Sequence, residues 1–388
     1  MRCFGSSKPA DEDFFASRRA PKRPLNILFF GTSEFAVPIL KRLSDARKGE
    51  SPIVADLQVI VPPKRAASVS GGDVPIVLAS QEESIPVHYV PKGTNFKMDG
   101  WEIPFPKGAF DIGVTASFGH MLPDHAIDYF PMGMINAHGS LLPKLRGASP
   151  IQTAILQGES ETGITIATLS AKSIDTGRVL SLHPYALRDD ITYPEAVSDL
   201  AQIAADAVLA ALVNWDRALL SSREQSQITP LESVPANLRR ARKIPQDFGK
   251  IRWAQQTATE IGRVCRAVLG YRPVSTALGG RRVLLKQARL VARTNADTMA
   301  VVGCDAPEQR IRAITALFGE GRCPGAAEYD SSVGELLVRC KEGIIAVREL
   351  QYECKPAVSA HSFAAGIGIV KGKKTVSFDA ESGNGGQP

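Results

Sequence analysis

Two polar side chains, Asn136 and His138, stand one residue apart in the stretch GMINAHGSLLPKLRGASPIQ, residues 133–152. An asparagine amide can donate hydrogen bonds to a carbonyl oxygen that is becoming an oxyanion, and a histidine can donate to the same oxygen or carry a proton. Near the end of a strand, side chains two residues apart point to the same face. The pair therefore suits attack of a nucleophile on a small carbonyl carbon, although such pairs also serve as ordinary strand-end hydrogen-bonding groups.

Chemistry of this kind needs a third group that accepts a proton and holds the imidazole in one tautomer. The sequence SIDTG, residues 173–177, offers Asp175 on a turn between two β-rich segments. Aspartate in such a turn can also be structural, because its side chain bonds backbone N–H groups. No G-x-S-x-G nucleophile elbow accompanies Asn136 and His138, so the pair is not itself a nucleophile site.

The elements that must position these residues begin at Leu25. The apolar run 25–30, then Gly-Thr-Ser and a helical pattern, predict a buried strand, a tight turn and a helix, which open an α/β unit. The turn lacks the G-x-G-x-x-G spacing, so a dinucleotide site is not supported. Further strands are expected at 53–61, at 110–117 and in a segment that ends near Ala137.

A loop at 62–75 follows the second of these strands and carries two adjacent cations, Lys64 and Arg65. Loops at the carboxyl ends of strands are where open α/β sheets bind ligands. Because the loop is also rich in Ser and Gly, we expect it to be flexible and to lie where a ligand binds.

Taken together, these patterns predict an α/β domain over residues 25–215, followed by a smaller second domain. Two alternating segments, TGITIATLS and GRVLSLHPYAL, favour an antiparallel addition to the sheet, and residues 192–215 a helix with an apolar core face. The polar stretch 216–243 is interpreted as a linker. Residues 244–371 predict a small β-rich barrel with one helix, and 372–388 a disordered tail.

Charge is divided unevenly along the 388 residues. Residues 216–388 hold 26 Lys and Arg against 17 Asp and Glu, whereas the whole chain has a net charge of only +6. A near-neutral first half joined to a basic second half fits a catalytic unit with a polyanion-binding unit, although a solubilising surface would look the same.

The six cysteines lie at positions with no C-x-x-C spacing, which suggests reduced thiols and neither a zinc site nor a disulfide framework. No uninterrupted apolar run of about 18 residues predicts a membrane span. Residues 1–24 contain Arg, Lys and Ser, as organelle transit segments do, but also the acidic triplet at 11–13. A plain disordered extension is the alternative interpretation.

Together these motifs resemble the folate-dependent formyltransferases. The resemblance rests on NAHGSLLPKLRGASPIQ followed by ETGITIATLS and IDTGRVL, and extends to ILFFGTSEFAVPIL, SFGHMLP and GKIRWAQQTATEIGRVCRAVLGYRPVSTAL. It covers most of residues 25–370. It implies a Rossmann-like formyltransferase domain followed by a smaller, OB-like β-barrel domain, and the whole-chain layout is most similar to the members that act on methionyl-tRNA.

The resemblance also implies roles for individual residues. Asn136, His138 and Asp175 match the catalytic residues of the family, and Ser140, Leu141, Leu142 and Pro143 match its folate-binding segment. Lys64 and Arg65 match an insertion that enters the acceptor end of tRNA, and the second domain matches one that grips tRNA. The implied donor is 10-formyltetrahydrofolate, the implied acceptor is the methionine amine on initiator methionyl-tRNA, and no metal is required.

Several alternatives and departures stay open. A formyltransferase with a small-molecule acceptor, or a formyltetrahydrofolate hydrolase, would share the same three residues, and a catalytically dead tRNA- or folate-binding protein would share the fold. The segment before Asp175 is one residue longer than the common bacterial pattern, and residues 294–333 look like an insertion of no function. We expect a monomer that does not associate with membranes, in the mitochondrial matrix or alternatively in a bacterial-type cytoplasm.

Overall fold

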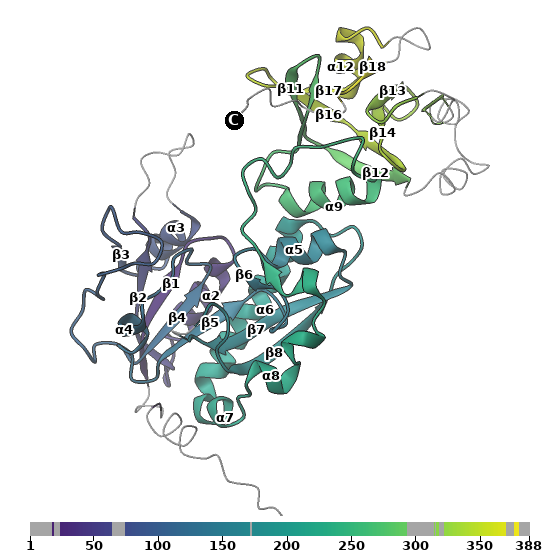
Figure 1. Ribbon diagram of the computed structural model, residues 1–388. Helices are drawn as coiled ribbons and strands as arrows, with labels where there is room; N and C mark the ends of the chain where they lie inside the picture. The colour runs from purple at the N-terminus through teal and green to yellow at the C-terminus, as the bar shows by residue number, and fades with distance from the viewer. Residues whose placement is uncertain are drawn as a thin grey trace, which may run out of the picture. The chain divides into compact units, whose positions relative to one another are not determined.

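The structure is a computed structural model that describes residues 18, 24–63, 74–170, 173–292, 314, 316–317, 322–369 and 376–379. The chain divides into two compact units (Figure 1). The first comprises Met1–Ala154, Glu159–Asp189 and Pro194–Lys243, and the second comprises Ile155–Gly158, Asp190–Tyr193 and Ile244–Pro388.

A seven-stranded sheet with the order β3-β2-β1-β4-β5-β7-β8 forms the centre of the first unit. Strands β1 to β5 are mutually parallel, and β7 and β8 join antiparallel. The predicted α/β domain with an antiparallel addition is therefore confirmed. The strands are β1 Leu25–Gly31, β2 Val54–Val61, β3 Val87–Tyr89, β4 Ile112–Ala116, β5 Met134–His138, β7 Glu161–Thr168 and β8 Val179–Ala186.

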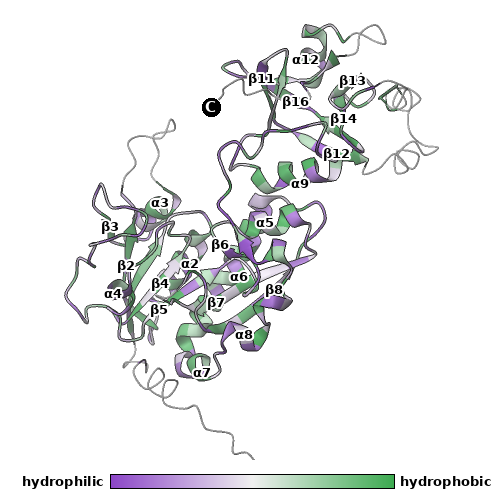
Figure 2. Ribbon diagram, viewed as in Figure 1, coloured by the Kyte–Doolittle hydropathy of each residue, from purple (hydrophilic) through white to green (hydrophobic). Residues whose placement is uncertain are grey.

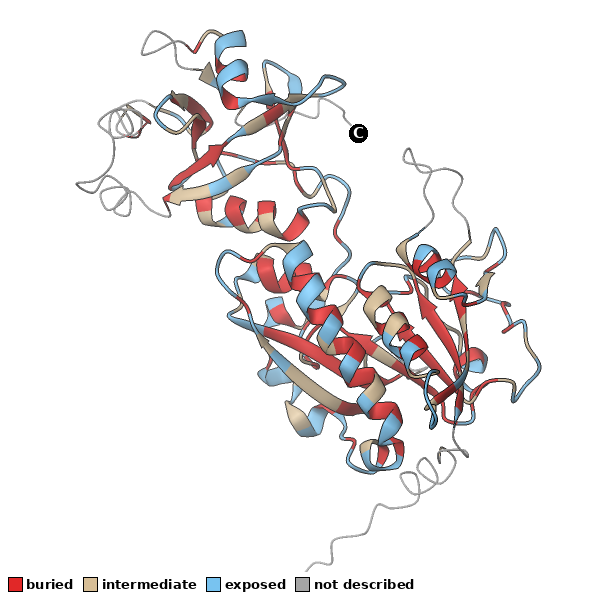
Figure 3. Ribbon diagram, turned by 180° about the vertical axis from the view of Figure 1, so that it is seen from behind, coloured by how far each residue is buried: buried red, intermediate tan, exposed pale blue. Residues whose placement is uncertain are grey.

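Hydrophobic strands explain why this sheet lies inside the unit. All residues of β4 and most of β1 are buried, as parallel strands covered on both faces require (Figure 3). The helices of this unit are α2 Ala36–Asp45, α3 Pro75–Glu82, α4 Asp124–Ile127, α5 Pro150–Gln157, α6 Tyr193–Val213, α7 Trp215–Leu220 and α8 Gln225–Ile228, of which residues 155–157 and Tyr193 are counted in the second unit.

Helix α6 matches the helix predicted at 192–215 and is the longest in the described part of the chain. By length and composition it could cross a membrane, with a mean hydropathy of 1.7 over its best window. Its apolar positions, Val197, Leu200, Ala204, Val208 and Leu212 among them, are buried at the spacing of one helix face. Core helices of folded domains have this same character.

The interpretation of residues 216–243 as a linker is wrong. This stretch contains α7, α8 and the short strand β9 Arg240–Ala241, which pairs parallel with β6 Arg146–Gly147. Ser222 and Gln225 are buried although they are polar. The polar composition misled because these side chains are satisfied by hydrogen bonds inside the first unit rather than by water.

The second unit contains two antiparallel sheets, with the orders β10-β11-β16-β17 and β12-β15-β14-β13-β18. Helix α9 is amphipathic, with hydrophobic and hydrophilic bands in Figure 2, and its buried side joins a core that includes Trp253 and Phe363. The elements are α9 Ala258–Val268, β10 Ser275–Leu278, β11 Arg281–Leu285, β12 Ala288–Ala292, β13 Ala326–Asp330, β14 Glu335–Arg339, β15 Ile344–Val347, β16 Glu349–Tyr352, β17 Val358–Ser359, α12 Ala360–Gly366 and β18 Val376–Ser377. The predicted hairpin that turns at 341–343 is confirmed as β14 and β15.

Two expectations about this unit need correction. The tail from 372 is not disordered throughout, because β18 pairs with β13 and Phe378 is buried in the core. The supposed insertion 294–333 includes β13, a central strand whose Ala326 and Ala327 are buried. Alanines give a weak β signal, so only the pairing with β14 reveals this strand. Most of the remaining insertion lies outside the described residues.

We predict that Glu335, at the start of β14, makes a contribution to the stability of the second unit that depends on pH. Its side chain is fully buried and accepts hydrogen bonds from Arg289 and Arg348 at 2.6–3.0 Å. Burial alone would raise the pKa of Glu335, but the hydrogen bonds and charges of the two arginines lower that pKa overall. A carboxyl with a lowered pKa stabilises the fold above its unfolded pKa, about 4.3, and loses this contribution as pH falls through the folded value.

We therefore expect Glu335→Gln to lower the free energy of unfolding of the second unit by about 1–3 kcal/mol at pH 7, because two half-exposed arginines lose their anion. Hydrogen exchange of amides in β14 and β15 measures this change. The difference from the unsubstituted protein should shrink below about pH 4. Glu353→Gln is the matched control, because its pair with Arg282 is exposed. An equal effect of both substitutions would contradict the prediction.

Candidate active site

Strand β5 carries Asn136 and His138 to the carboxyl-terminal end of the parallel sheet. Asn136 lies opposite Thr115 of β4 and Ala167 of β7, and His138 lies opposite Thr165 of β7. Their side chains emerge on the same face of the sheet, because the two residues are two positions apart in one strand. This edge is where doubly wound sheets bind ligands.

Asp175 reaches the same place from the turn between β7 and β8. Its Oδ1 atom lies 3.4 Å from Nδ2 of Asn136 and 3.7 Å from Nδ1 of His138. Its Oδ2 atom accepts a hydrogen bond of 2.9 Å from the backbone N–H of Gly147. The three residues singled out in the sequence therefore converge, with one carboxylate oxygen facing both the carboxamide and the imidazole.

The imidazole of His138 is held by a backbone carbonyl. Its Nε2 atom lies 3.0 Å from the oxygen of Leu145, and the ring is almost completely buried. A carbonyl only accepts, so Nε2 carries a proton, and Nδ1 faces Asp175. The 3.7 Å to Asp175 is too long for a direct hydrogen bond, so the carbonyl of Leu145 fixes the tautomer and the carboxylate acts through its charge.

The turn that presents Asp175 has a demanding backbone. Asp175 itself has a φ of 53°, in the left-handed region that aspartate tolerates better than most residues. At Gly177 an added Cβ would lie 1.6 Å from the carbonyl oxygen of Thr168, so no larger residue fits. The glycine of the D-T-G sequence is thus required by the close approach of this turn to β7.

The segment 140–143 shapes the loop that follows His138. Ser140 donates from Oγ to the carbonyl of Lys144 at 2.7 Å, and the N–H of Leu142 donates to Oγ1 of Thr165 at 3.0 Å. Ser140, Leu142 and Pro143 are buried, whereas Leu141 is partly exposed. Of these four residues, Leu141 is therefore the one whose side chain is partly open to solvent.

Two residues near the site were given no role from the sequence. The guanidinium of Arg146 donates to Oε1 of Gln225 from Nε at 3.0 Å and from Nη2 at 2.6 Å. Burial lowers the pKa of Arg146, and the nearby Asp175 carboxylate partly offsets this effect. Arg146 lies within the quoted motif, but Gln225 lies in a polar stretch with no periodic signal. Lys64 and Arg65 lie outside the described residues.

Comparison with known proteins places this chain in a family. Residues 25–212 match the model described as formyl transferase, and residues 243–368 match that of the formyl transferase C-terminal domain. The mitochondrial methionyl-tRNA formyltransferase of Mus musculus is 30% identical over 92% of this chain and 81% of its own length. The chain belongs to the methionyl-tRNA formyltransferase family. The enzyme of the same name from Paramagnetospirillum magneticum is 32% identical over 70% of this chain and 84% of its own length.

Solved structures show the same fold as this formyltransferase at lower identity. An N-formyltransferase from Helicobacter canadensis, in complex with folinic acid and dTDP-3-aminofucose, has a TM-score of 0.51 at 16% identity, over 84% of this chain and 99% of that one. HypX from Aquifex aeolicus also has a TM-score of 0.51, at 14% identity, over 89% of this chain and 48% of its own. These likenesses support the expected fold class, an α/β formyltransferase domain followed by a domain of antiparallel strands.

Proposed function

We propose that this formyltransferase transfers the formyl group of 10-formyltetrahydrofolate to the amino group of methionine on initiator methionyl-tRNA. The observation that carries the proposal is the convergence of Asn136, His138 and Asp175 on one point at the carboxyl edge of the sheet. The relatives named methionyl-tRNA formyltransferase in mitochondria and bacteria support the acceptor.

The reaction begins when the lone pair of the methionine nitrogen attacks the formyl carbon. A C–N bond forms while the π electrons of the carbonyl move to its oxygen, which becomes an oxyanion. The amide of Asn136 would donate to this oxygen, and the ring of His138 would help to hold it in place. The oxyanion then collapses, and the bond between the formyl carbon and N10 of the folate breaks.

Asp175 would carry out the two proton transfers that these reaction steps need. The attacking nitrogen becomes positively charged and must lose a proton, and the departing N10 must gain one. The Oδ1 atom of Asp175 can take the first proton, directly or through water, and return it to N10. Its Oδ2 atom remains bound to Gly147, which keeps the carboxylate aimed during both transfers.

The folate donor would lie along the loop after β5. Leu141 offers a partly exposed apolar side chain to the ring system, and the buried Ser140, Leu142 and Pro143 hold that loop in place. The donor set of carboxamide, imidazole and carboxylate needs no metal for the chemistry proposed.

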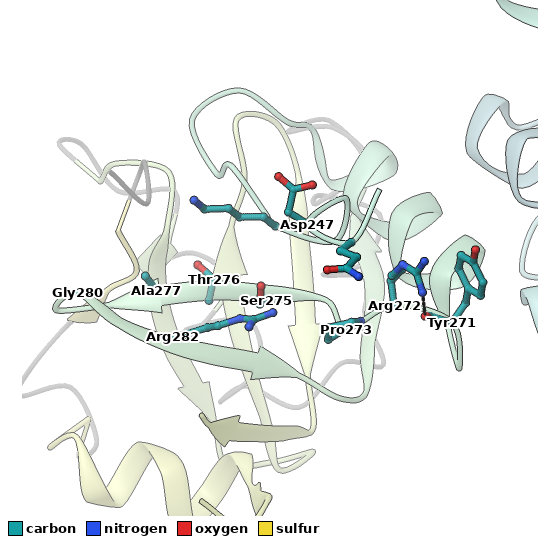
Figure 4. A pocket seen from close by; sticks show the side chains of 11 residues that line it. Asp247, Tyr271, Arg272, Pro273, Ser275, Thr276, Ala277, Gly280 and Arg282 are labelled. Carbon is teal, nitrogen blue, oxygen red and sulfur yellow. Dashed lines mark hydrogen bonds between the residues drawn. The ribbon is translucent and has the colours of Figure 1, made fainter. Parts of the chain in front are cut away.

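The second unit supplies cationic groups suited to a tRNA backbone. A hollow of about 680 Å³ between the loop 246–250 and strands β10 and β11 is lined by Lys250, Arg272 and Arg282, with Asp247 as the one acidic group (Figure 4). The guanidinium of Arg272 is fixed by a 2.9 Å hydrogen bond to the carbonyl of Tyr271. We propose this hollow as a phosphate contact, in addition to the contacts proposed for Lys64 and Arg65.

The affinity for tRNA should therefore fall steeply with salt. Three phosphates neutralised in this hollow alone would give a slope of about −2.7 in log affinity against log salt, or a loss of about 40-fold between 50 and 200 mM. Arg282→Gln should reduce that slope by about 1, whereas Lys107→Gln, on the exposed surface of the first unit, should leave it unchanged. Fluorescence anisotropy of labelled tRNA measures the slope, and salt-independent binding would contradict the electrostatic contact.

The direct test mixes the purified protein, 10-formyltetrahydrofolate and charged initiator tRNA and measures formyl-methionine. Formylated methionyl-tRNA is the expected product. Release of formate without any acceptor, or transfer to a small amine with methionyl-tRNA left unmodified, would instead establish the hydrolase or small-molecule alternative. We propose a mitochondrial location, with a bacterial-type cytoplasm as the alternative, because the relatives include proteins of both kinds.

A further inference from the structure

Gln225, at the start of α8, uses every polar atom of its side chain on the active-site loops. Its Nε2 atom donates to the carbonyl oxygens of Asp175 and Gly177 at 2.8 and 3.0 Å. Its Oε1 atom accepts both hydrogen bonds from Arg146. The residue is 3% exposed, so water does not replace any of these partners. One buried amide therefore connects the turn of Asp175 to the strand β6.

We propose that Gln225 is the positioning residue that aims the carboxylate of Asp175. Asp175 lies in the turn, outside the paired residues of β7 and β8, so its backbone carbonyl needs a separate donor. Gln225 is that donor. The backbone conformation of Asp175 sets the direction of its side chain. By holding the backbone carbonyl of Asp175, the amide of Gln225 therefore also fixes the direction of the Asp175 carboxylate.

The other half of the amide fixes the group that binds the carboxylate. Arg146 immediately precedes Gly147, whose N–H donates to Oδ2 of Asp175. Gly147 has a φ of 124°, and an added Cβ would lie 2.5 Å from the carbonyl oxygen of Ala241, so its position is tightly defined. Gln225 thus holds both ends of the contact between Gly147 and Asp175. The other carboxylate oxygen is left facing Asn136 and His138.

The segment around Gln225 has anchors of its own, so its amide is not needed merely to keep the segment in place. Arg178 donates to the carboxylate of Glu224 at 2.8 Å and to Oγ and the carbonyl of Ser222 at 3.0 and 2.9 Å. The backbones of Val179 and Arg223 exchange two hydrogen bonds of 2.8 and 3.0 Å. Removal of the Gln225 amide should therefore free the Asp175 turn while residues 222–224 stay attached.

The first test is kinetic and rests on the proposed function. Gln225→Ala is expected to lower kcat by about 10- to 100-fold, with KM for both substrates changed less than about threefold, because a small displacement of the carboxylate weakens proton transfer more than binding. Gln227→Ala is the matched control, since Gln227 lies in the same helix and its side chain caps only the N–H of Glu224. Near-normal kcat in Gln225→Ala would overturn the proposal.

A double-mutant cycle separates positioning from general stability. If Gln225 acts through Asp175, then Gln225→Ala in an Asp175→Asn background should lower kcat by less than about twofold further. A loss as large as that in the unsubstituted background would overturn the proposal, because it would show an effect independent of the carboxylate. Should Gln225→Ala fail to fold, Gln225→Glu keeps the volume and the acceptor for Arg146 but sets an oxygen against the two carbonyls, and the same results are expected.

A substrate-free measurement keeps this inference distinct from the proposed function. Hydrogen exchange at the N–H of Gly147 should be at least about tenfold faster in Gln225→Ala, while exchange at the N–H of Val179 stays within about twofold. If the unsubstituted protein does not formylate methionyl-tRNA but the Gly147 exchange rises, the proposed function fails and the positioning role stands. Unchanged exchange at Gly147 overturns the positioning role, whatever the activity.

Discussion

Replacement of Asp175 by asparagine is expected to lower kcat for formyl transfer by at least about 100-fold. The N–H of Gly147 needs an acceptor, so the new amide oxygen should take the place of Oδ2 and leave an NH2 group facing Asn136 and His138. That group cannot accept the proton of the attacking amine, and the charge beside the imidazole is lost. Asp175→Ala should have an effect at least as large, because it also leaves the N–H of Gly147 without this partner.

Single-turnover kinetics with saturating folate and charged tRNA measure the effect of Asp175→Asn on the chemical step. Asp206→Asn makes the same change of charge in the same unit, at an exposed ion pair with Arg42, and should leave kcat within about twofold. The thermal midpoint of Asp175→Asn should stay close to that of the unsubstituted protein. Normal turnover in a folded Asp175→Asn protein would remove the carboxylate from the mechanism.

Asn136→Ala is expected to lower kcat by about 10²–10³-fold. The loss of one donor to a developing oxyanion typically raises the barrier by about 2.7–4 kcal/mol, since the donor is already oriented before the reaction. Asn136 is oriented by its place in β5 and by the 3.4 Å contact with Oδ1 of Asp175. The dissociation constant for folate should change much less than kcat, because the contact strengthens as the oxyanion forms.

The measurement for Asn136→Ala compares kcat with the equilibrium affinity for the folate, determined without tRNA. Asn136→Ser and Asn136→Asp distinguish the possible roles, because serine keeps a short donor and aspartate has none when ionised. We expect Asn136→Ser to keep part of the activity, and Asn136→Asp to have a kcat no higher than that of Asn136→Ala. Equal losses in kcat and in folate affinity would instead assign Asn136 to ground-state binding.

The sequence predicts the elements of the first unit well because their hydrophobic patterns are strong. The run 25–30 and the segment that ends near Ala137 become β1 and β5, and their order places Asn136 and His138 at a ligand-binding edge. Asp175 could be proposed because the chemistry needs a third group, the sequence SIDTG offers a carboxylate on a turn, and the resemblance matches that residue to a catalytic one. The distance between Asp175 and His138 could not be predicted, because that distance depends on how closely the turn before β8 approaches β7.

Residues that act through buried hydrogen bonds escaped prediction for a physical reason. A glutamine in a polar stretch has the same sequence signal whether it faces water or donates to two carbonyls, and Gln225 does the second. Leu145 offers an equal difficulty, because its backbone carbonyl, not its side chain, binds His138. Phe378 was missed because it follows a Lys-rich segment whose composition is typical of a disordered tail.

The pairing of β6 with β9 bears on how the catalytic unit could be isolated and on when it matures during synthesis. The N–H of Leu145 donates to the carbonyl of Leu238, and Gly147 rests against Ala241. A fragment that stops at residue 215 would therefore keep the whole seven-stranded sheet yet lack the residues that support Leu145 and Gly147. For the same reason, a fragment that ends at Lys243 is the shortest we would choose. On the ribosome, the loop should reach its final shape only after Ala241 has left the exit tunnel.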